Sequence, residues 1–205
     1  MKKLIIIGAG GHGRVVADIA KKAGLYDSIS FLDDGGNEES LSLPILGGTD
    51  SIEKYIPEAD FFVAIGNAKI RRTFLERLTK AGASLPSLVH PAATIGSSVK
   101  IGEGTAIMAG AVVNPLVKIG RGVIINTAAT VDHDSVIGDF SHVSVGAHLA
   151  GTVTLGDECF IGAGAVVIND ISITAGTVIG AGAAVIKNIT ESGTYAGVPA
   201  AKKHD

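Results

Sequence analysis

An aliphatic residue occupies every sixth position across the second half of this chain, and this spacing limits the possible fold more than any other feature. A period of six is a multiple of the two-residue repeat of a strand and not of the 3.6-residue repeat of a helix. We therefore expect short strands joined by turns, with one strand and one turn in each repeat. The sixteen positions are Ile95, Ile101, Ile107, Val113, Ile119, Ile125, Val131, Ile137, Val143, Leu149, Leu155, Ile161, Val167, Ile173, Ile179 and Val185.

Small residues accompany the aliphatic ones, so the repeat predicts a narrow, solid core. A mostly small side chain comes four residues after each aliphatic position, and glycine often follows the aliphatic residue directly. The chain is 46% hydrophobic but only 4% aromatic, which suits a core of Val, Ile, Leu and Ala. If three hexads make one coil, the series stacks into about five coils, or ~24 Å at the ~4.8 Å spacing of neighbouring strands. An ordinary β-sandwich would not keep one spacing for so long.

The first 89 residues have a different pattern, in which strands alternate with helices. Apolar runs at 4–7, 30–32 and 61–65 predict buried strands, with a helix after the first and after the third. This alternation indicates a small Rossmann-like parallel α/β domain over residues 1–89, followed by a β-helix domain with a C-terminal tail over residues 90–205. The inner faces expected for the two helices are Val15, Val16, Ile19 and Ala20, and Ile70, Phe74, Leu75 and Leu78.

Composition and charge exclude several classes of protein. Charged residues make up 18% of the chain, below the usual ~25%, which argues against disorder. The formal charge of −3 argues against a nucleic-acid or anionic-membrane partner. The single cysteine, Cys159, excludes a disulfide framework and is expected to pack in the core; no zinc spacing is present and no metal is expected. No apolar run reaches the ~18–20 residues of a membrane span, and the run after Lys3 is short for a signal peptide, so we expect a cytoplasmic protein.

The segment Gly8-Ala9-Gly10-Gly11-His12-Gly13 follows the first strand and matches the dinucleotide-binding fingerprint. Asp33 comes 20 residues after the last of these glycines, where an acid that binds ribose is expected. Such a loop offers backbone N–H groups and a helix N-terminus to a pyrophosphate. An NAD site is one interpretation, but the space before the repeats fits half of a dinucleotide fold. One nucleotide diphosphate is the better match, and a structural turn is the alternative.

His133 is the main candidate for a catalytic residue. It follows the inward Val131 by two positions and is flanked by Asp132 and Asp134. A carboxylate that accepts a hydrogen bond from one imidazole nitrogen fixes the tautomer and raises the basicity of the other nitrogen, as a general base requires. Asp and His also occur together in surface turns, so the residues alone leave both interpretations open. A structural role is expected for His90, a surface position for His148, and no specific role for His204 in the C-terminal tail.

Six motifs run from one end of the chain to the other: Gly10-Gly11-His12-Gly13, Phe31-Leu32-Asp33-Asp34, Ala64-Ile65-Gly66-Asn67, His133-Asp134 with Val136-Ile137-Gly138, Ser141-His142-Val143-Ser144-Val145-Gly146, and Gly197-Val198-Pro199-Ala200. With the hexads, they resemble the hexapeptide-repeat acyltransferases that carry an N-terminal sugar-nucleotide-binding domain. That branch includes the PglD-type UDP-4-amino-sugar N-acetyltransferases and the NeuD-type sialic acid O-acetyltransferases. The resemblance implies a left-handed parallel β-helix, a homotrimer with active sites between subunits, and acetyl-CoA as the donor.

The resemblance also implies roles for individual residues. His133 corresponds to the proposed base, and the residue after it tunes that base; the family has Glu there, whereas Asp134 is one methylene shorter. The stacking of coils places Gly151 one coil beyond His133, where its backbone N–H would meet the developing oxyanion. Contacts with the nucleotide sugar are implied for Gly10, Gly11, His12, Asp33, Asp34 and Gly66. Contacts with acetyl-CoA are implied for His142, which we place at a coil corner, and for Ala163 and Ala181 in the pantetheine groove, with residues 197–200 over the nucleotide end.

We therefore expect an acetyl-CoA-dependent N-acetyltransferase that acts on the 4-amino group of a nucleotide-linked amino-deoxy sugar, with UDP as the expected nucleotide, in glycan or polysaccharide biosynthesis. The amine is expected to attack the thioester directly, because no nucleophile is placed to form a covalent intermediate. The main alternative is O-acetylation of a sialic acid or related sugar by the same residues. An NAD-binding oxidoreductase and a non-enzymatic trimeric scaffold are the other two alternatives.

Overall fold

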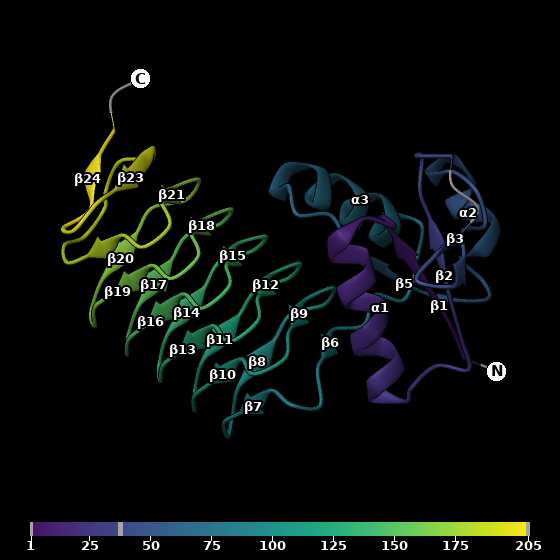
Figure 1. The fold of residues 1–205 in the computed structure, drawn as a ribbon, viewed down its shortest axis with the longest axis horizontal. Coiled ribbons are helices and arrows are strands. Elements are labelled where there is room, and N and C mark those ends of the chain that lie inside the picture. The colour runs from purple at the N-terminus through teal and green to yellow at the C-terminus, as the bar shows by residue number, and fades with distance from the viewer. Residues whose placement is uncertain (1, 37–38, 204–205) are drawn as a thin grey trace. The chain divides into compact units, whose positions relative to one another are not determined.

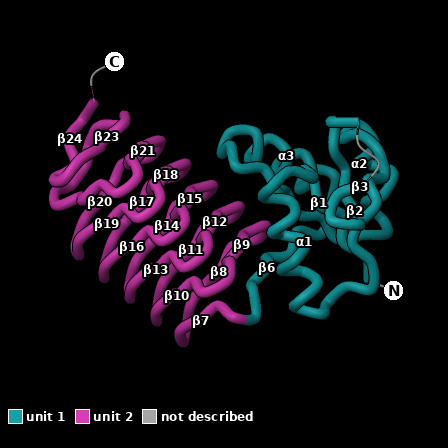
Figure 2. The backbone as a smooth tube through the Cα atoms, viewed as in Figure 1, with its two compact units in different colours: residues 1–91 teal, residues 92–205 magenta. Residues whose placement is uncertain are grey.

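The computed structural model describes residues 2–36 and 39–203 and divides the chain into two compact units, residues 1–91 and 92–205 (Figures 1 and 2). The first unit contains the three α-helices, and the second is a stack of short strands (Figure 1). His204 lies outside the described residues. No helix in the described part of the chain is long and apolar enough to cross a membrane.

A three-stranded parallel sheet forms the centre of the first unit, in the order β2-β1-β5. The helix α1 packs against β1 and β2, and α3 packs against β5. The carboxyl ends of the three strands therefore lie along one edge of the sheet, and the loops that follow them meet there. The elements of this unit are β1 (Lys3–Ile7), α1 (Gly11–Ala23), β2 (Ser28–Leu32), β3 (Glu39–Ser40), β4 (Leu43–Pro44), the 3₁₀ turn η1 (Thr49–Ser51), α2 (Ile52–Tyr55), β5 (Asp60–Val63), α3 (Ala68–Lys80) and β6 (Leu88–Val89).

The inner faces of α1 and α3 differ in part from those expected from the sequence. In α1, Val16, Ile19 and Ala20 are buried as expected, but Val15 is 42% exposed. In α3, Leu75 and Leu78 are buried as expected, but Phe74 is only partly buried and Ile70 is 47% exposed. In α3 the residue that follows Ile70, Arg71, is buried.

The second unit is a parallel β-helix with three faces, each a ladder of strands of two or three residues. Every coil contributes 18 residues, so that Val113 pairs with Val131 and Ile125 with Val143. The first face has six strands and the second has five. The first face consists of β7 (Thr94–Ile95), β10 (Val112–Val113), β13 (Thr130–Val131), β16 (His148–Leu149), β19 (Val166–Val167) and β22 (Ala184–Val185).

The other two faces complete each coil and are built in the same way. The second face consists of β8 (Lys100–Ile101), β11 (Lys118–Ile119), β14 (Val136–Ile137), β17 (Thr154–Leu155) and β20 (Ser172–Ile173). In this unit the third face consists of β9 (Ala106–Ile107), β12 (Ile124–Ile125), β15 (His142–Val143), β18 (Phe160–Ile161), β21 (Val178–Ile179), β23 (Thr194–Ala196) and β24 (Ala201–Lys202).

The core of the β-helix is the column of aliphatic side chains that the sixfold spacing predicts. From Ile107 to Val185 these side chains are buried, whereas Ile95, on the edge strand of its face, is 37% exposed. Cys159 packs among the small inward residues, and burial raises the pKa of its thiol. At Gly138, directly after β14, the coils are too close for a side chain: a Cβ there would lie 2.5 Å from the carbonyl carbon of Gly156. The expected fold, a small parallel α/β domain followed by a left-handed parallel β-helix, is confirmed.

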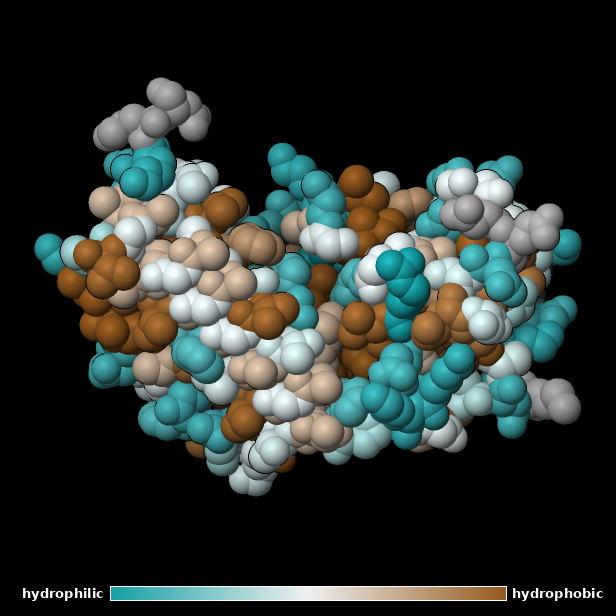
Figure 3. All heavy atoms as spheres, in the orientation of Figure 1, coloured by the Kyte–Doolittle hydropathy of each residue, from teal (hydrophilic) through white to brown (hydrophobic). Residues whose placement is uncertain are grey.

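Apolar side chains also reach the surface of the β-helix. Figure 3 shows brown, hydrophobic residues on this surface. Phe160 and Val178 project outward from neighbouring strands of the third face, and Val166 projects from the first face; each is about two-fifths exposed. In the single chain these apolar side chains are exposed to water.

Candidate functional site

The turn between β13 and β14 carries His133 and Asp134 at the corner between the first and second faces. The backbone N–H of His133 donates to a carboxylate oxygen of Asp132 at 2.8 Å, which shapes the turn. Asp134 adopts a left-handed backbone with φ of 59°, and this turns its side chain back toward the histidine. Its Oδ2 lies 2.9 Å from Nδ1 of His133. The shorter Asp therefore reaches the imidazole that the Glu of the resembling family would reach.

The electrostatics of this corner favour a basic imidazole. The hydrogen bond with Asp134 is the largest cause that raises the pKa of His133 above its ordinary value; burial opposes it, and the charges of Asp132, Asp134 and Asp170 add to it. With Nδ1 donating to Asp134, Nε2 is the nitrogen that can accept a proton. The side chain of His133 is 57% exposed, so the imidazole lies largely at the surface.

Gly151 lies directly against the imidazole of His133. It occupies the equivalent turn position one coil later, and the N–H of its neighbour Thr152 donates to the carbonyl of His133 at 2.9 Å. A Cβ on Gly151 would lie 2.7 Å from both Cε1 and Nε2 of the ring. The imidazole ring can take this position because Gly151 has no side chain. Among the described residues, the backbone N–H of Gly151 has no hydrogen-bond acceptor.

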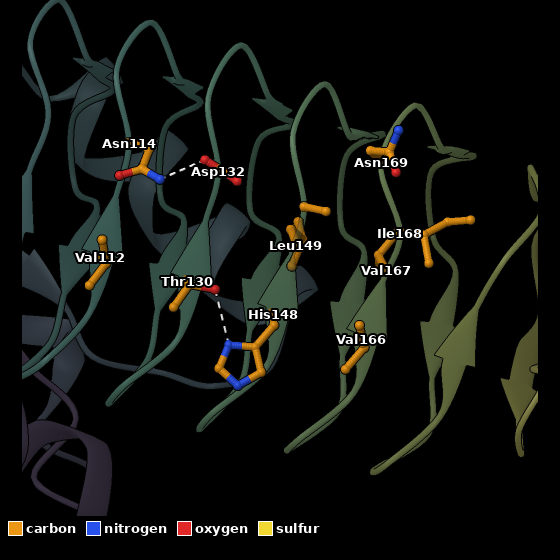
Figure 4. Close-up of a pocket in the computed structure, with 11 residues that line it drawn as sticks. Val112, Asn114, Thr130, Asp132, His148, Leu149, Val166, Val167, Ile168 and Asn169 are labelled. Atoms are coloured by element: carbon orange, nitrogen blue, oxygen red, sulfur yellow. Dashed lines mark hydrogen bonds between the residues drawn. The ribbon is translucent and has the colours of Figure 1, made fainter.

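A groove of about 500 Å³ runs along the first face beside this corner (Figure 4). Two side-chain hydrogen bonds join neighbouring coils within it. Asn114 donates to Asp132 at 2.6 Å, and the Thr130 hydroxyl lies 3.0 Å from Nδ1 of His148. His148 is exposed, as expected for a surface group, but it is also part of the groove wall. The apolar part of the wall is formed by Val112, Leu149, Val166, Val167 and Ile168.

His142 does not lie at a coil corner, which corrects the expectation from the sequence. It is the outward residue of β15 on the third face, because it directly precedes the inward Val143. Its Nε2 lies 3.0 Å from the side-chain amide of Asn126, and its ring meets the edge of Phe160 with centroids 5.1 Å apart. Asn126 was not identified from the sequence, although its position after an inward aliphatic residue matches that of Asn114.

Ala163 and Ala181 stack one coil apart at the corner between the third and first faces. Both are exposed, and the carbonyl of Ala163 accepts from the N–H of Gly182 at 2.9 Å. Together with His142, they lie on sides of the prism other than the corner that carries His133. A single β-helix therefore brings His133, Asp134 and Gly151 together but does not bring His142, Ala163 and Ala181 to them.

The N-terminal loop follows β1 and enters α1 through closely packed glycines. Gly8 has φ of 97°, and a Cβ on Gly13 would lie 1.9 Å from the carbonyl oxygen of Gly8, so only glycine fits at the start of this helix. The helix begins with no acidic residue in its first turn and no side-chain cap, and a Cβ on Gly10 would meet no atom within 4 Å. The N-terminus of α1 therefore has free backbone donors beside open space, as a phosphate group requires.

Two carboxylates at the end of β2 connect this loop to its neighbours. Asp33 accepts from the N–H of Ala9 at 2.8 Å and from the N–H of Gly35 at 2.8 Å. Asp34 accepts from the N–H and the hydroxyl of Thr49 at 2.7 and 3.0 Å. Both carboxylates also line an open pocket of about 420 Å³. The two carboxylates thus hold the loops in position, and they also face this open pocket.

His12 and the buried Arg71 form the inner side of the N-terminal site. Burial, and then the charge of Arg71, lower the pKa of His12 from 6.5 to about 4, so its imidazole is neutral near pH 7. Nε2 of His12 is buried and has no hydrogen-bond partner in the described part of the chain. Arg71 donates to the carbonyls of Ile65 and Gly66, both at 2.8 Å. The hydrophobic pattern of α3 gave no signal for Arg71, because a charged residue stands where an apolar one is expected.

The described residues contain no cluster of three His, Cys, Asp or Glu side chains that would hold a metal ion. The glycines, His12 and the two aspartates gather at the carboxyl ends of β1 and β2, and Gly66 lies in the loop after β5. The chain thus carries two candidate sites. One is an N-terminal loop site with backbone donors, and the other is a histidine–aspartate pair on the β-helix.

Two family models match this chain. The model described as PglD N-terminal domain matches residues 3–78, and the model described as bacterial transferase hexapeptide (six repeats) matches residues 134–169. A curated relative, UDP-N-acetylbacillosamine N-acetyltransferase from Bacillus subtilis (strain 168), is 38% identical over 115 residues. That match covers 53% of this chain and 52% of the relative, so the chain spans about half the length of the curated relative it matches.

Solved structures are similar over the full length of the chain. The acetyltransferase domain of PglB from Neisseria gonorrhoeae FA1090, in complex with acetyl coenzyme A, is 43% identical with a TM-score of 0.97 and covers 98% of this chain and 99% of that chain. A variant of perosamine N-acetyltransferase from Caulobacter crescentus, in complex with CoA and GDP-perosamine, is 35% identical with a TM-score of 0.96 and covers 100% of this chain and 98% of that chain.

Proposed function

Since this chain belongs to the PglD-type hexapeptide-repeat sugar acetyltransferases, we propose that it transfers the acetyl group of acetyl-CoA to the 4-amino group of a nucleotide-linked amino-deoxy sugar. The observation that carries the proposal is the pairing of His133 with Asp134 against Gly151. The full-length similarity to structures solved with acetyl-CoA, or with CoA and a nucleotide sugar, supports the two substrates.

In the proposed mechanism, His133 acts as the general base. Asp134 accepts the hydrogen bond from Nδ1–H and stabilises the imidazolium that forms when Nε2 takes a proton from the attacking amine. The amine attacks the thioester carbon, the C–S bond breaks, and the CoA thiolate leaves as a thiol after it takes the proton from the His133 imidazolium, which restores the neutral base. The backbone N–H of Gly151 would donate to the oxyanion of the tetrahedral intermediate. Cys159 is buried with a raised pKa, which favours direct transfer without an acyl-enzyme.

The N-terminal unit is proposed to hold the nucleotide part of the acceptor. Its diphosphate would lie at the N-terminus of α1, beside Gly10 and Gly11, with His12 and Gly66 facing the ligand. The name of the Bacillus relative supports UDP as the nucleotide, whereas the Caulobacter structures contain GDP-perosamine. The proposed role is in the biosynthesis of a glycan or polysaccharide in the cytoplasm.

Acetyl-CoA is proposed to lie between two copies of the β-helix in a homotrimer. The support is the separation within one chain: His142, Ala163 and Ala181 lie on other sides of the prism from His133. The exposed Phe160, Val178 and Val166 provide apolar surface for such an interface. In this arrangement the third face of one copy meets the first face of the next, and the groove of Figure 4 lies within the contact.

The experiment is an acetyl-transfer assay with a panel of acceptors. The protein is incubated with acetyl-CoA and UDP- or GDP-linked 4-amino-4-deoxy sugars, the same nucleotide sugars with a 4-hydroxyl, and free sialic acid, and CoA release and product mass are measured. We expect transfer to a 4-amino sugar nucleotide, and a loss of ~10²–10⁴ in turnover in His133→Ala. Transfer to sialic acid alone would instead identify an O-acetyltransferase and contradict the proposal.

A further inference from the structure

Arg71 stands out among the charged residues because it is buried in the inner face of α3. Only 1% of its surface is exposed. A guanidinium in the interior is costly unless its N–H groups are hydrogen-bonded. Its Nη1 donates at 2.8 Å to the carbonyls of Ile65 and Gly66, two consecutive residues of the loop between β5 and α3. Arg71 thus holds the loop that contains Gly66 from the inside.

The two carbonyls that accept hydrogen bonds from Arg71 determine the direction of two backbone N–H groups. In a planar trans peptide the C=O and the N–H of one unit point in opposite directions. The carbonyl of Ile65 shares its peptide unit with the N–H of Gly66, and the carbonyl of Gly66 shares its unit with the N–H of Asn67. Because Arg71 draws both carbonyls inward, both N–H groups point to the opposite side of the loop.

The space on that side is open. Gly66 and Asn67 are exposed, and a Cβ on Gly66 would meet no atom within 4 Å. Among the described residues, neither of the two N–H groups has a hydrogen-bond acceptor. The Asn67 side chain is already used, since its Oδ1 accepts from the N–H of Ile70 as the cap of α3. The loop therefore presents two backbone donors that a ligand can use.

This loop adjoins the rest of the N-terminal site. A Cβ on Gly8 would lie 3.0 Å from the carbonyl of Ala64, so the loops after β1 and β5 are in contact. The charge of Arg71 also reaches His12, where it contributes to keeping the imidazole neutral. Arg71 is thus placed to act on both the Gly66 loop and His12 from beneath the site.

We propose that Arg71 is a positioning residue of the nucleotide-sugar site: by holding the carbonyls of Ile65 and Gly66, it directs the N–H groups of Gly66 and Asn67 toward acceptor oxygens of the bound nucleotide sugar. This inference rests on the proposed function of the N-terminal site. Arg71 itself does not touch the ligand in this account. Its substitution therefore changes the affinity for the acceptor and not the chemistry at His133.

The test compares Arg71→Met, Arg71→Lys and the matched control Lys69→Met, which removes an exposed cation from the same helix. Hydrogen exchange of residues 64–68 is measured without ligand, and KM is measured for a UDP-linked 4-amino-4-deoxy sugar and for acetyl-CoA. In Arg71→Met we expect faster exchange of this loop and a KM for the sugar nucleotide raised roughly 10- to 100-fold, with kcat and the KM for acetyl-CoA nearly unchanged. Arg71→Lys is expected to lie between Arg71→Met and the wild type, and Lys69→Met to match the wild type.

Loop exchange and sugar-nucleotide KM that match the wild type in Arg71→Met would overturn the inference. If Arg71→Met unfolds the first unit, Arg71→Lys decides the question, and wild-type values of both quantities in that variant would overturn it as well. If the wild type neither binds nor acetylates the sugar nucleotide, the proposed function fails. The exchange measurement then still shows whether Arg71 orders the loop.

Discussion

Replacement of Gly151 by alanine adds one methyl group where two coils of the β-helix meet the proposed base. The new Cβ would lie 2.7 Å from Cε1 and Nε2 of His133, whereas ordinary contact begins at 3.4 Å. The ring would therefore have to move by at least ~0.7 Å to restore close packing without overlap. Gly151 does not have a left-handed backbone, so alanine adds no backbone strain, and its N–H is kept.

The expected effect is on turnover. A displacement of ~1 Å of a catalytic group costs on the order of 10²-fold in rate, so we expect kcat to fall roughly 10- to 100-fold in Gly151→Ala. The assay is CoA release with a UDP-linked 4-amino-4-deoxy sugar, together with a crystal structure of the variant to locate the imidazole. Ala175→Ser is the control, since it adds one atom to an exposed turn residue elsewhere on the β-helix.

Two results would refute this reasoning. Wild-type kcat with a displaced ring would show that the position of His133 does not matter for transfer. Reduced kcat with the ring in its original place would show that the methyl group acts in another way, for example on the proposed oxyanion donor.

Three further predictions follow from the contacts at the two sites. Asp134→Asn removes the charge and weakens the hydrogen bond that together raise the pKa of His133. In a plot of kcat/KM against pH, the limb on which activity rises with pH should therefore move to lower pH. An unmoved limb would remove Asp134 from the mechanism. Asp33→Ala leaves the N–H groups of Ala9 and Gly35 without their acceptor, so the KM for the sugar nucleotide should rise about 10-fold while the KM for acetyl-CoA stays the same, and an equal rise in both would contradict this assignment. Because the pKa of His12 is lowered from 6.5 to about 4, the unfolded chain binds a proton there that the folded chain does not. The free energy of unfolding of the first unit should therefore fall by about 3 kcal/mol between pH 6.5 and pH 4. In His12→Asn, the protection of the β1 amides from hydrogen exchange should depend less on pH.

The β-helix could be predicted from the sequence because its contacts repeat. Each inward aliphatic residue pairs with the one 18 positions later, so one spacing determines the strands, the core and the stacking of coils. The same register placed Gly151 next to His133, and the structure has the two in contact. The prediction that His142 lies at a coil corner was wrong. His142 directly precedes an inward residue, so it belongs to a strand.

The N-terminal helices were harder to predict, because a hydrophobic pattern gives the phase of a helix only to about one residue. Ile70 and Arg71 are neighbours, and hydrophobicity alone favours burying the isoleucine. The structure buries Arg71 instead, because the carbonyls of Ile65 and Gly66 accept its hydrogen bonds. Those carbonyls belong to a loop whose path the sequence does not reveal. Asn126 and the groove around His148 were missed for a similar reason, since they depend on side chains from neighbouring coils.

The most direct measurement is a crystal structure of the protein with CoA and a 4-amino sugar nucleotide, the proposed acceptor, bound. We predict that the 4-amino nitrogen lies within ~3.2 Å of Nε2 of His133, with the CoA sulfur on the far side of the space where the acetyl group would be. A complex in which the amino group lies against a different side chain, away from His133, would contradict the account.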